Sequence, residues 1–229
     1  MSLTIENVAP YLGQPIYDIY GRKVGTLVSV YSDVDGTVTA LEMMMNDAVY
    51  ETLPAERFEH TSEGLKVVPE WLATVKKVEK KLDVLRKRVK ALEDLHKKGQ
   101  VPEHAYKELR DKLSKEFEKA KGDSKHMKEV LRKRIYELEN FVLHIEKAMT
   151  HLMVSYTAGE LPEQGFKNSM DLLRYAKHTA LEEKKDVEKH LSLLEKLEQE
   201  AIKAVSFEVE SAVPTSSGGP IAVKVVNSS

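Results

Sequence analysis

The sequence predicts an α+β protein, in which a small antiparallel β-barrel is followed by long antiparallel helical hairpins (a coiled coil) and a flexible tail. Residues 1–70 contain short β-branched runs separated by turn residues. Residues 71–205 follow a heptad pattern, and the last residues combine a Gly/Ser/Pro-rich stretch with a single strand pattern. We therefore divide the chain into a β domain (1–70), a helical region (71–205), a linker (206–219) and a C-terminal strand (220–229).

Composition separates these segments and narrows the class of protein. Charged residues make up 31% of the chain and aromatic residues 7%, which favours an elongated helical protein over a compact enzyme. Residues 1–70 hold 4 Lys/Arg against 11 Asp/Glu, whereas residues 71–205 hold 30 against 24. The absence of cysteine excludes disulfides, thiol catalysis and Cys-based zinc sites. Neither a signal-peptide pattern nor a long apolar run is present, so we expect an intracellular protein without a membrane-spanning helix.

The β domain is predicted from two apolar runs and the turn between them. KVGTLVSVYS (23–32) and TVTALEMMM (37–45) flank the sequence DVDG. Asp35-Gly36 is typical of a hairpin turn, because glycine readily adopts the positive φ that such turns need. Five or six short strands fit between Gly13 and Leu65, which predicts a small antiparallel barrel.

This stretch also resembles the PRC-barrel domains. LGQPIYDIYGRKVGTLVSVYSDVDGTVTALEM, followed by VYETLPAERF, contains an apolar-Gly pair, a polar-Gly-x-x-apolar-Gly turn and a hairpin with an acidic turn. The glycines at those places are Gly13, Gly21, Gly25 and Gly36. The resemblance covers residues 10–68. It implies the barrel fold but no particular activity, because such domains occur in photosynthetic, RNA-processing and cell-division proteins.

From Trp71 onward, apolar residues are spaced alternately three and four positions apart, which is the a/d heptad pattern of a coiled-coil seam. A second seam has the same spacing, and each of its residues lies 60 positions after the corresponding residue of the first. The seams are narrow, and the last predicted helix is longer than the helices that it would pack against. We therefore expect other copies of the chain to cover the apolar seams. Self-association into an open-ended polymer follows from such surfaces. The predicted self-association seam consists of Val75, Val78, Leu82, Leu85, Val89, Leu92, Ile135, Leu138, Val142, Ile145, Met149 and Leu152.

The same offset continues beyond the seams, which indicates an internal repeat with a period of 60. GQVPEHAYK (99–107) returns as GELPEQGFK (159–167), with the Gly, Pro, Glu and Lys positions identical. The glycine suits a left-handed helix C-terminus and the proline suits the first turn of the next helix, so each repeat predicts an αα-hairpin. We expect helices over 71–98 and roughly 162–204. Gly122-Asp123 leaves open whether the region between them contains a turn or only a kink.

No arrangement of side chains predicts catalysis, and we expect neither a cofactor nor a metal. GELPEQGFKNS (159–169) is no phosphate-binding loop, because its glycine spacing is wrong and no Gly-Lys-Ser/Thr follows. His144 and His151 share a helix face but lack the i+3 or i+4 spacing of a helical metal site. Glu182-Glu183 is flanked by Lys184-Lys185 and is therefore predicted to lie on a solvated face.

Basic residues cluster in the first helical segment, where residues 76–98 hold ten Lys/Arg against four acidic residues. Such a helix can contact DNA phosphates without reading sequence, or anionic lipid headgroups. The alternative is the ordinary charged flank of a coiled coil. The candidate nucleic-acid or lipid contacts are Arg86, Lys87, Arg88, Arg132, Lys133 and Arg134.

The chain ends in a strand pattern that follows the flexible PTSSGGP (214–220). A strand this short does not fold alone. We favour its addition to a sheet edge on another protein, in pockets for Ile221, Val223 and Val225. Addition to the chain's own barrel and absence of function are the alternatives. The candidate partner-binding residues are Pro220, Ile221, Ala222, Val223, Lys224, Val225 and Val226.

The order of parts resembles the CdvA family of archaeal cell-division proteins. The resemblance covers the whole chain and rests on the N-terminal signature and the tail. It implies that Pro220 to Val226 bind the ESCRT-III protein CdvB by completing a sheet in its winged-helix-like domain. It also implies filament formation, association with membrane and DNA, and an early role at midcell.

We therefore predict a non-enzymatic, filament-forming scaffold of archaeal cell division. It would lie at the inner face of the midcell membrane, or at the nucleoid, and recruit CdvB through its C-terminal strand. The alternative is a DNA-organising coiled-coil protein that uses the basic helices. An RNA-processing role for the barrel finds no support elsewhere in the chain.

Overall fold

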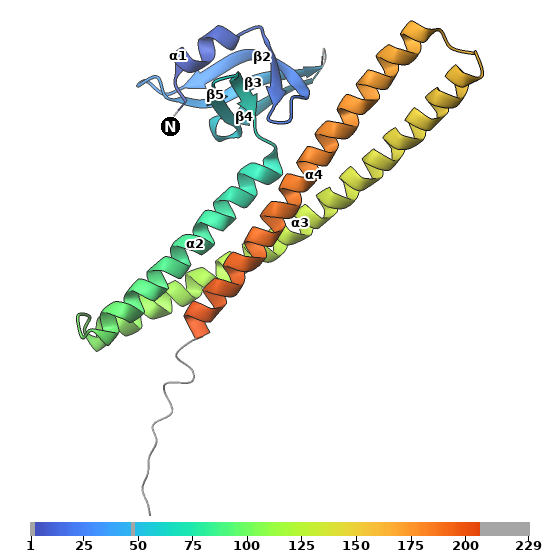
Figure 1. Ribbon diagram of the computed structural model, residues 1–229. Helices are drawn as coiled ribbons and strands as arrows, with labels where there is room; N and C mark the ends of the chain where they lie inside the picture. Colours follow the sequence, from blue (N-terminus) through green and yellow to red (C-terminus); the bar gives the residue numbers. More distant parts are fainter. Residues whose placement is uncertain (1–2, 47–48, 207–229) are drawn as a thin grey trace, which may run out of the picture.

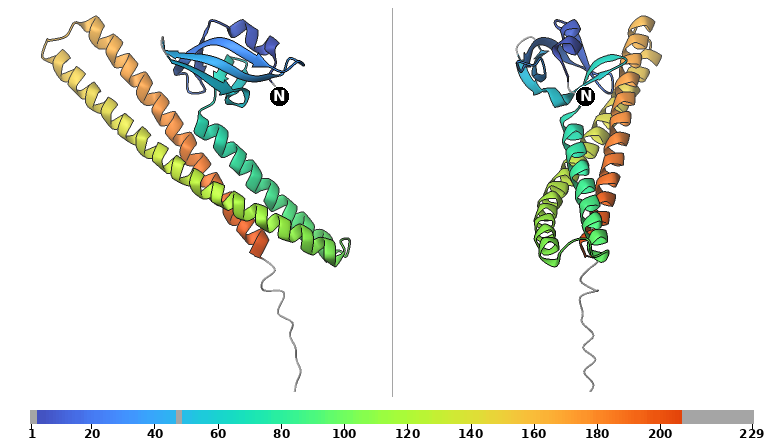
Figure 2. Two further views of the ribbon diagram at one scale, coloured as in Figure 1. Left: turned by 180° about the vertical axis from the view of Figure 1, so that it is seen from behind. Right: turned by 90° about the vertical axis from the view of Figure 1, so that its left-hand side faces the viewer.

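The computed structural model describes residues 3–46 and 49–206 and confirms the predicted α+β class. A curled β sheet lies next to a long helical bundle, close to the start of the first long helix and to the first half of the last one (Figure 1). The views in Figure 2 show that the bundle is elongated and that its two ends are far apart.

One six-stranded sheet forms the β domain, in the order β4-β3-β2-β1-β6-β5. Its strands are β1 (Pro15–Asp18), β2 (Lys23–Ser32), β3 (Val38–Asn46), β4 (Val49–Pro54), β5 (Phe58–Thr61) and β6 (Gly64–Val67). The short helix α1 (Ile5–Val8) and the 3-10 turn η1 (Ala9–Tyr11) precede them, and the 3-10 turn η2 (Ala55–Arg57) joins β4 to β5.

The sheet is a half-barrel that stays open between β4 and β5, where a barrel of antiparallel strands was expected. β1 and β6 pair in parallel, while the other neighbours are antiparallel. Because η2 redirects the chain after β4, β5 pairs with β6 instead of returning to β4. The predicted hairpin at Asp35-Gly36 is confirmed: Gly36 has φ +80° and its N–H donates to the carbonyl of Asp33 at 3.0 Å.

The concave side of the sheet encloses a small hydrophobic core. Alternate residues of the strands face inward, as period-2 alternation requires. The buried residues of this core are Val8, Ile16, Leu27, Val38, Leu41, Met43, Leu53, Phe58, Leu65 and Val67.

Three long helices form the rest of the described chain: α2 (Glu70–Lys97), α3 (Glu103–Thr157) and α4 (Glu163–Ser206). At 1.5 Å per residue they are about 42, 83 and 66 Å long. Pro69 and Pro102 stand immediately before α2 and α3, where a missing N–H costs nothing. α2 is too short to follow the whole α3–α4 pair, so a three-helix bundle continues as a two-helix arm on one side of the β domain (Figure 2).

α3 runs without interruption through Gly122-Asp123, so neither a turn nor a break occurs there. A glycine inside a helix costs about 1 kcal/mol relative to alanine, which is too little to end a helix held by tertiary packing. Ala120 and Ser124 flank the glycine and are both fully buried against the other helices. Packing on the inner face of α3 therefore holds the helix together at this point.

The two helix–helix turns are equivalent, as the repeated Gly-x-x-Pro pattern predicts. Gly99 and Gly159 have φ of +67° and +77°, the left-handed conformation expected at a helix C-terminus. Their N–H groups donate to the carbonyls of His96 and Tyr156 at 2.9 and 3.0 Å. Each turn therefore ends one helix at the glycine and leads the chain into the next helix.

Aromatic rings stack across both turns in the same way. His96 lies on Tyr106 with ring centroids 3.9 Å apart, and Tyr156 lies on Phe166 with centroids 4.1 Å apart. Each stack joins the last turn of one helix to the first turns of the following helix. Each repeat thus builds one αα-hairpin, and α3 is shared by both.

Candidate functional site

A buried carboxylate joins the β domain to all three long helices. Glu183 of α4 has no solvent exposure. Its Oε1 accepts hydrogen bonds from Trp71 Nε1 of α2 at 3.0 Å and Arg134 Nε of α3 at 2.8 Å. Its Oε2 accepts from Arg134 Nη2 at 2.9 Å and lies 2.6 Å from Nη1 of Arg22. Because Arg22 belongs to the β1–β2 turn, this side chain links the β domain directly to the bundle.

Opposite charges lie next to one another in this cluster and stabilise the ionised form of each group. Burial opposes ionisation of Glu183, yet the neighbouring Arg134 and Arg22 guanidinium groups hold the pKa of its carboxyl below the usual value. Asp18 adds a second carboxylate, whose Oδ2 lies 2.7 Å from Arg22 Nη2. Both oxygens of Glu183 have two donors, which is the condition for an ion pair to be tolerated in a protein interior.

Two tyrosines extend the contact between the β domain and α4. Tyr20 donates its hydroxyl to Asp186 at 3.2 Å, and Tyr175 donates its hydroxyl to the carbonyl of Gly21 at 2.7 Å. Burial, the nearby Asp186 carboxylate and its hydrogen bond raise the pKa of Tyr20 far above the usual range. The β domain is therefore held at several points along α4, which gives it a fixed orientation.

The predicted solvated face at Glu182-Glu183 is therefore wrong for Glu183. A signal for its burial exists in the sequence, because Glu183 occupies a core position of a third heptad seam. The seam, on α4, reads Ala180, Glu183, Val187, His190, Leu194, Leu197 and Ala201. His190 also has a partner inside the bundle, since its Nδ1 lies 2.7 Å from Glu79 Oε1 of α2. Polar residues in a heptad seam indicate buried pairs when each can reach a complementary group.

The comparisons with known proteins agree with this architecture. The CdvA-like coiled-coil domain matches residues 70–216. "Cell division protein A" of Sulfolobus acidocaldarius is 30% identical over 237 residues, which covers 99% of each chain. The chain belongs to the CdvA family. No solved structure matches it. Membership of the CdvA family supports a role in cell division.

In this CdvA-family chain, the α2 half of the predicted self-association seam is buried inside the bundle. α3 and α4 of the same chain cover these positions, and none is more than 9% exposed. The residues concerned are Val75, Val78, Leu82, Leu85, Val89 and Leu92. A contact between copies through them would require the bundle to open.

The α3 half of the seam faces α4, in the arm and just below it. Leu138 and Ile145 are buried, while Ile135, Val142, Met149 and Leu152 are partly exposed. The predicted seam thus closes hairpins within one chain. A heptad pattern does not indicate whether the covering helix comes from the same chain or from another copy, because the apolar spacing of the seam is the same for either arrangement.

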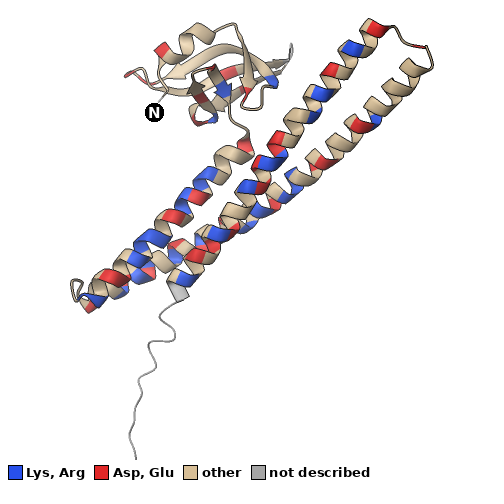
Figure 3. Ribbon diagram, viewed as in Figure 1, with Lys and Arg blue, Asp and Glu red and all other residues tan. Residues whose placement is uncertain are grey.

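The candidate phosphate-binding residues mostly pair with acidic residues of the same chain. Arg86 contacts Asp83 and Glu200, and Lys87 also contacts Asp83. On α3 the basic group is paired as well, through Arg132 with Glu195, Lys133 with Glu137, and Arg134 with Glu183 and Glu137. Arg88 lies at the rim of a groove between α2 and α3. Figure 3 shows basic and acidic residues interleaved along the bundle.

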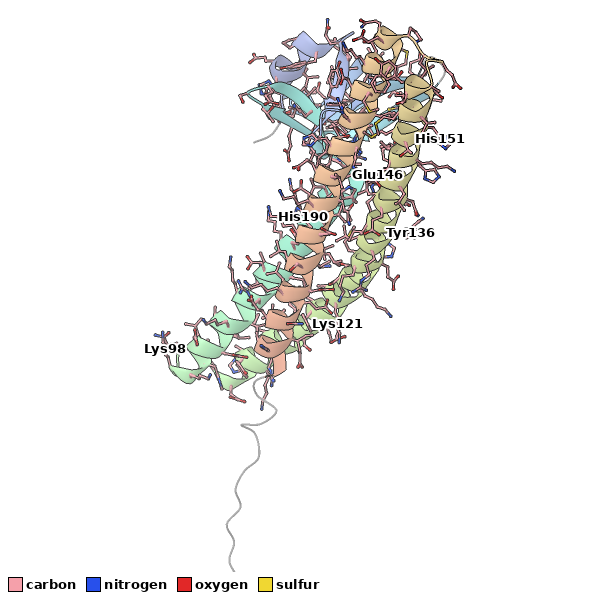
Figure 4. The ribbon with its side chains drawn as sticks, turned by 45° about the vertical axis from the view of Figure 1, so that its right-hand side comes forward. Lys98, Lys121, Tyr136, Glu146, His151 and His190 are labelled. Carbon is pink, nitrogen blue, oxygen red and sulfur yellow. The ribbon has the colours of Figure 1, made fainter. Side chains whose placement is uncertain are left out.

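The two ends of the bundle expose apolar side chains. On the arm, Tyr136, Leu143 and Val154 are 65%, 61% and 63% exposed. They share one side of α3, because their spacing is close to whole numbers of helical turns; Figure 4 labels Tyr136 on this side, away from α4. We call these three residues the arm face. At the opposite end, Leu95 and Leu109 are 41% and 47% exposed.

The groove at this opposite end lies between α2 and α3, and we call it the tip groove. Its lining is apolar with a charged rim, and comprises Arg88, Ala91, Leu92, Leu95, Leu109, Lys112, Leu113 and Glu116. A groove of this kind between two helices suits a third helix or another apolar segment.

The C-terminal strand, Pro220 to Val226, lies outside the described residues, as does most of the predicted linker. Within the described part of the chain, no helix is long and apolar enough to cross a membrane. Over the same residues, no group of three or more metal-binding side chains comes together.

Proposed function

We propose that this protein is a non-enzymatic, filament-forming scaffold of cell division that brings the ESCRT-III protein CdvB to the membrane at midcell. The observation that carries the proposal is the buried joint at Glu183, which contacts the β domain, α2 and α3 at once and so holds the β domain against the bundle. A polymer of defined geometry needs subunits of one shape. A flexible joint would allow the β domain a different orientation relative to the bundle in each copy. Membership of the CdvA family supplies the cellular context.

Two apolar surfaces at opposite ends of the bundle support polymerisation. The arm face consists of exposed side chains on one side of α3, whereas the tip groove is a hollow between α2 and α3. When the arm face of one copy packs in the tip groove of the next, the contact is heterologous, and it propagates instead of closing into a dimer. The buried seams then stabilise each subunit, and the exposed ends join subunits together.

The C-terminal strand is the proposed CdvB-binding element. An extended segment that adds to a sheet edge gains affinity from its main-chain hydrogen bonds and selectivity from alternate side chains. Here those side chains are Ile221, Val223 and Val225. A polymer presents many tails together, so a modest affinity for each tail gives strong overall binding.

Polymerisation is tested by changing the arm face. We expect the double variant Tyr136→Glu, Leu143→Glu to remain in the supernatant on high-speed centrifugation and to show no filaments in negative stain. The matched control is Lys125→Glu, Glu129→Lys, which alters two exposed residues on the same helix within the three-helix region. If the arm-face variant forms filaments as the wild type does, the proposed contact is wrong.

CdvB capture is tested by changing the tail. Deletion of 217–229 is expected to abolish capture of the CdvB winged-helix-like domain and to leave polymerisation intact. Val223→Asp should weaken capture strongly, whereas Ala222→Asp, on the other face of the strand, should weaken it much less. Loss of both capture and polymer on deletion would contradict the separate roles proposed for tail and bundle.

The DNA-organising alternative is less favoured, because phosphate contacts would have to compete with the ion pairs of Arg86, Lys87, Arg132 and Arg134. It predicts that Ala at positions 86, 87 and 88 reduces the slope of DNA affinity against salt concentration. An unchanged slope would rule out this part of α2 as the DNA contact.

A further inference from the structure

The β domain has a strand edge beside an open groove. β5 is the last strand of the sheet, and within the described residues it pairs only with β6. In an antiparallel pair, alternate residues direct their N–H and C=O groups away from the partner strand, so β5 presents such groups outward. The groove next to this edge is lined by Leu3, Asn7, Thr37, Val38, Ala55, Glu56, Phe58, Glu59, His60 and Thr61. We call it the β5 groove.

We propose that the β5 groove holds the C-terminal strand, Pro220 to Val226, of the same chain when no partner is bound. The inference rests on the proposed function of that strand, and it adds a regulatory step: the strand is stored on its own β domain, and CdvB must displace it. The occupant adds a seventh strand to the sheet by pairing with β5, which is the mode of recognition expected for an exposed strand edge.

The chemistry of the groove matches the strand. Its apolar lining, from Leu3, Val38, Ala55 and Phe58, can receive Ile221, Val223 and Val225 from one face of the strand. The other face carries Lys224, which would lie near Glu56 and Glu59. These two carboxylates contact Lys77 and Lys76, but the pairs are about half exposed and so can exchange partners at little cost.

The chain between α4 and the strand is long enough to make the connection. Glu56 and Glu59 contact α2 at Lys77 and Lys76, so the groove lies beside this part of α2. α4 runs parallel to α2 and ends six residues beyond Glu200, which contacts Arg86. The return path along the bundle is therefore about 24 Å, at 1.5 Å per residue.

Residues 207–219 span about 43 Å when extended, at about 3.3 Å per residue. This length covers the path of about 24 Å and leaves enough to cross the width of a helix, about 10 Å. A segment tethered in this way experiences an effective concentration in the millimolar range. If the strand binds the groove with a Kd of about 0.1 mM, storage raises the apparent Kd for CdvB about tenfold.

Disulfide trapping tests the placement, since the chain has no cysteine of its own. We expect His60→Cys, Val223→Cys to form an intramolecular disulfide in dilute solution, seen as a monomer of altered mobility on a non-reducing gel. The control pair is Tyr50→Cys, Val223→Cys, because Tyr50 is 59% exposed on β4, at the other edge of the sheet. Disulfides formed only between chains, or formed equally fast in both pairs, would overturn the proposal.

Hydrogen exchange gives an independent measurement on the protein without cysteines. Val223→Pro removes a strand N–H, and it should speed several-fold, relative to wild type, the exchange of those amides in 58–61 that point away from β6. Pro substitution at Ser217, in the linker, is the control and should leave these amides unchanged. Equal exchange in wild type and Val223→Pro would show that no strand pairs with the open edge of β5, opposite β6.

Competition with CdvB tests the regulatory step. Glu56→Lys, Glu59→Lys should repel Lys224 and tighten binding of the CdvB winged-helix-like domain several-fold, whereas Glu51→Lys on β4 should not. No change in affinity would contradict storage. If no form of the protein binds CdvB while the intramolecular disulfide still forms, the proposed CdvB recruitment is wrong and the placement of the strand stands.

Discussion

The indole N–H of Trp71 donates a hydrogen bond to the carboxylate of Glu183 across 3.0 Å in the interior of the protein. Trp71 lies where the β domain passes into α2, and Glu183 lies midway along α4. Arg22 and Arg134 meet the same carboxylate from the β1–β2 turn and from α3. One side chain of α4 thus ties together four segments that are distant in the sequence.

Removing this carboxylate should destabilise the protein strongly. In Glu183→Ala the Arg22 and Arg134 guanidinium groups lose their shared buried partner, and breaking such a pair typically costs about 3–5 kcal/mol. Urea unfolding followed by circular dichroism measures the loss. The adjacent Glu182→Ala alters an exposed residue and should change stability by less than about 0.5 kcal/mol. Equal effects of the two substitutions would contradict the role assigned to Glu183.

The same carboxylate should make stability fall in acid. Its pKa is lower in the folded protein than the unfolded value near 4.3, so the folded state binds the proton less readily than the unfolded state. The stabilisation is present above the unfolded pKa and is lost as the pH falls through the folded pKa. We expect the unfolding free energy of the wild type to decline between about pH 5 and pH 3 more steeply than that of Glu183→Gln, measured in parallel urea titrations. Parallel pH profiles for the two proteins would refute this.

The hydroxyl of Tyr20 should resist ionisation in alkali. Burial and the Asp186 carboxylate raise its pKa in the folded state, so its contribution to stability is present below the unfolded pKa and declines as the pH rises above it. Absorbance at 295 nm should show one tyrosine that ionises only when the protein unfolds. Tyr20→Phe should lack this late component and keep the rest of the titration. A wild-type titration in which every tyrosine ionises near pH 10 would contradict the buried contact.

Replacing Gly122 by alanine should stabilise α3. Gly122 lies inside the helix and a Cβ built there meets no atom within 4 Å, so alanine gains helix propensity of about 0.5–1 kcal/mol without a clash. Gly99→Ala is the contrasting variant, because Gly99 has φ +67° and a side chain there is strained. Thermal unfolding should show a higher midpoint for Gly122→Ala and a lower one for Gly99→Ala. A lower midpoint for Gly122→Ala would indicate that the glycine has a role beyond the helix.

Local patterns predicted the elements well, because each pattern reports a backbone preference of its own segment. The heptads predicted α2, and the two Gly-x-x-Pro turns predicted both hairpins and their equivalence. The heptad spacing on α4 places Glu183 at a core position, but no local pattern predicts the buried cluster that it forms. Its partners Arg22, Trp71 and Arg134 come from distant segments of the chain, and the neighbouring lysines made it look solvated.

Periodicity and turn residues act over a few neighbouring positions, so they were sufficient for the α+β class, the β2–β3 hairpin at Asp35-Gly36 and the repeated helical hairpins. Three other features became evident only from the packing of the folded chain. α4 closes the α2 seam within one chain, Glu183 locks the β domain in place, and the sheet stays open at β5. These features depend on which distant surfaces meet, and the heptad periodicity of one segment does not identify the segment that packs against it.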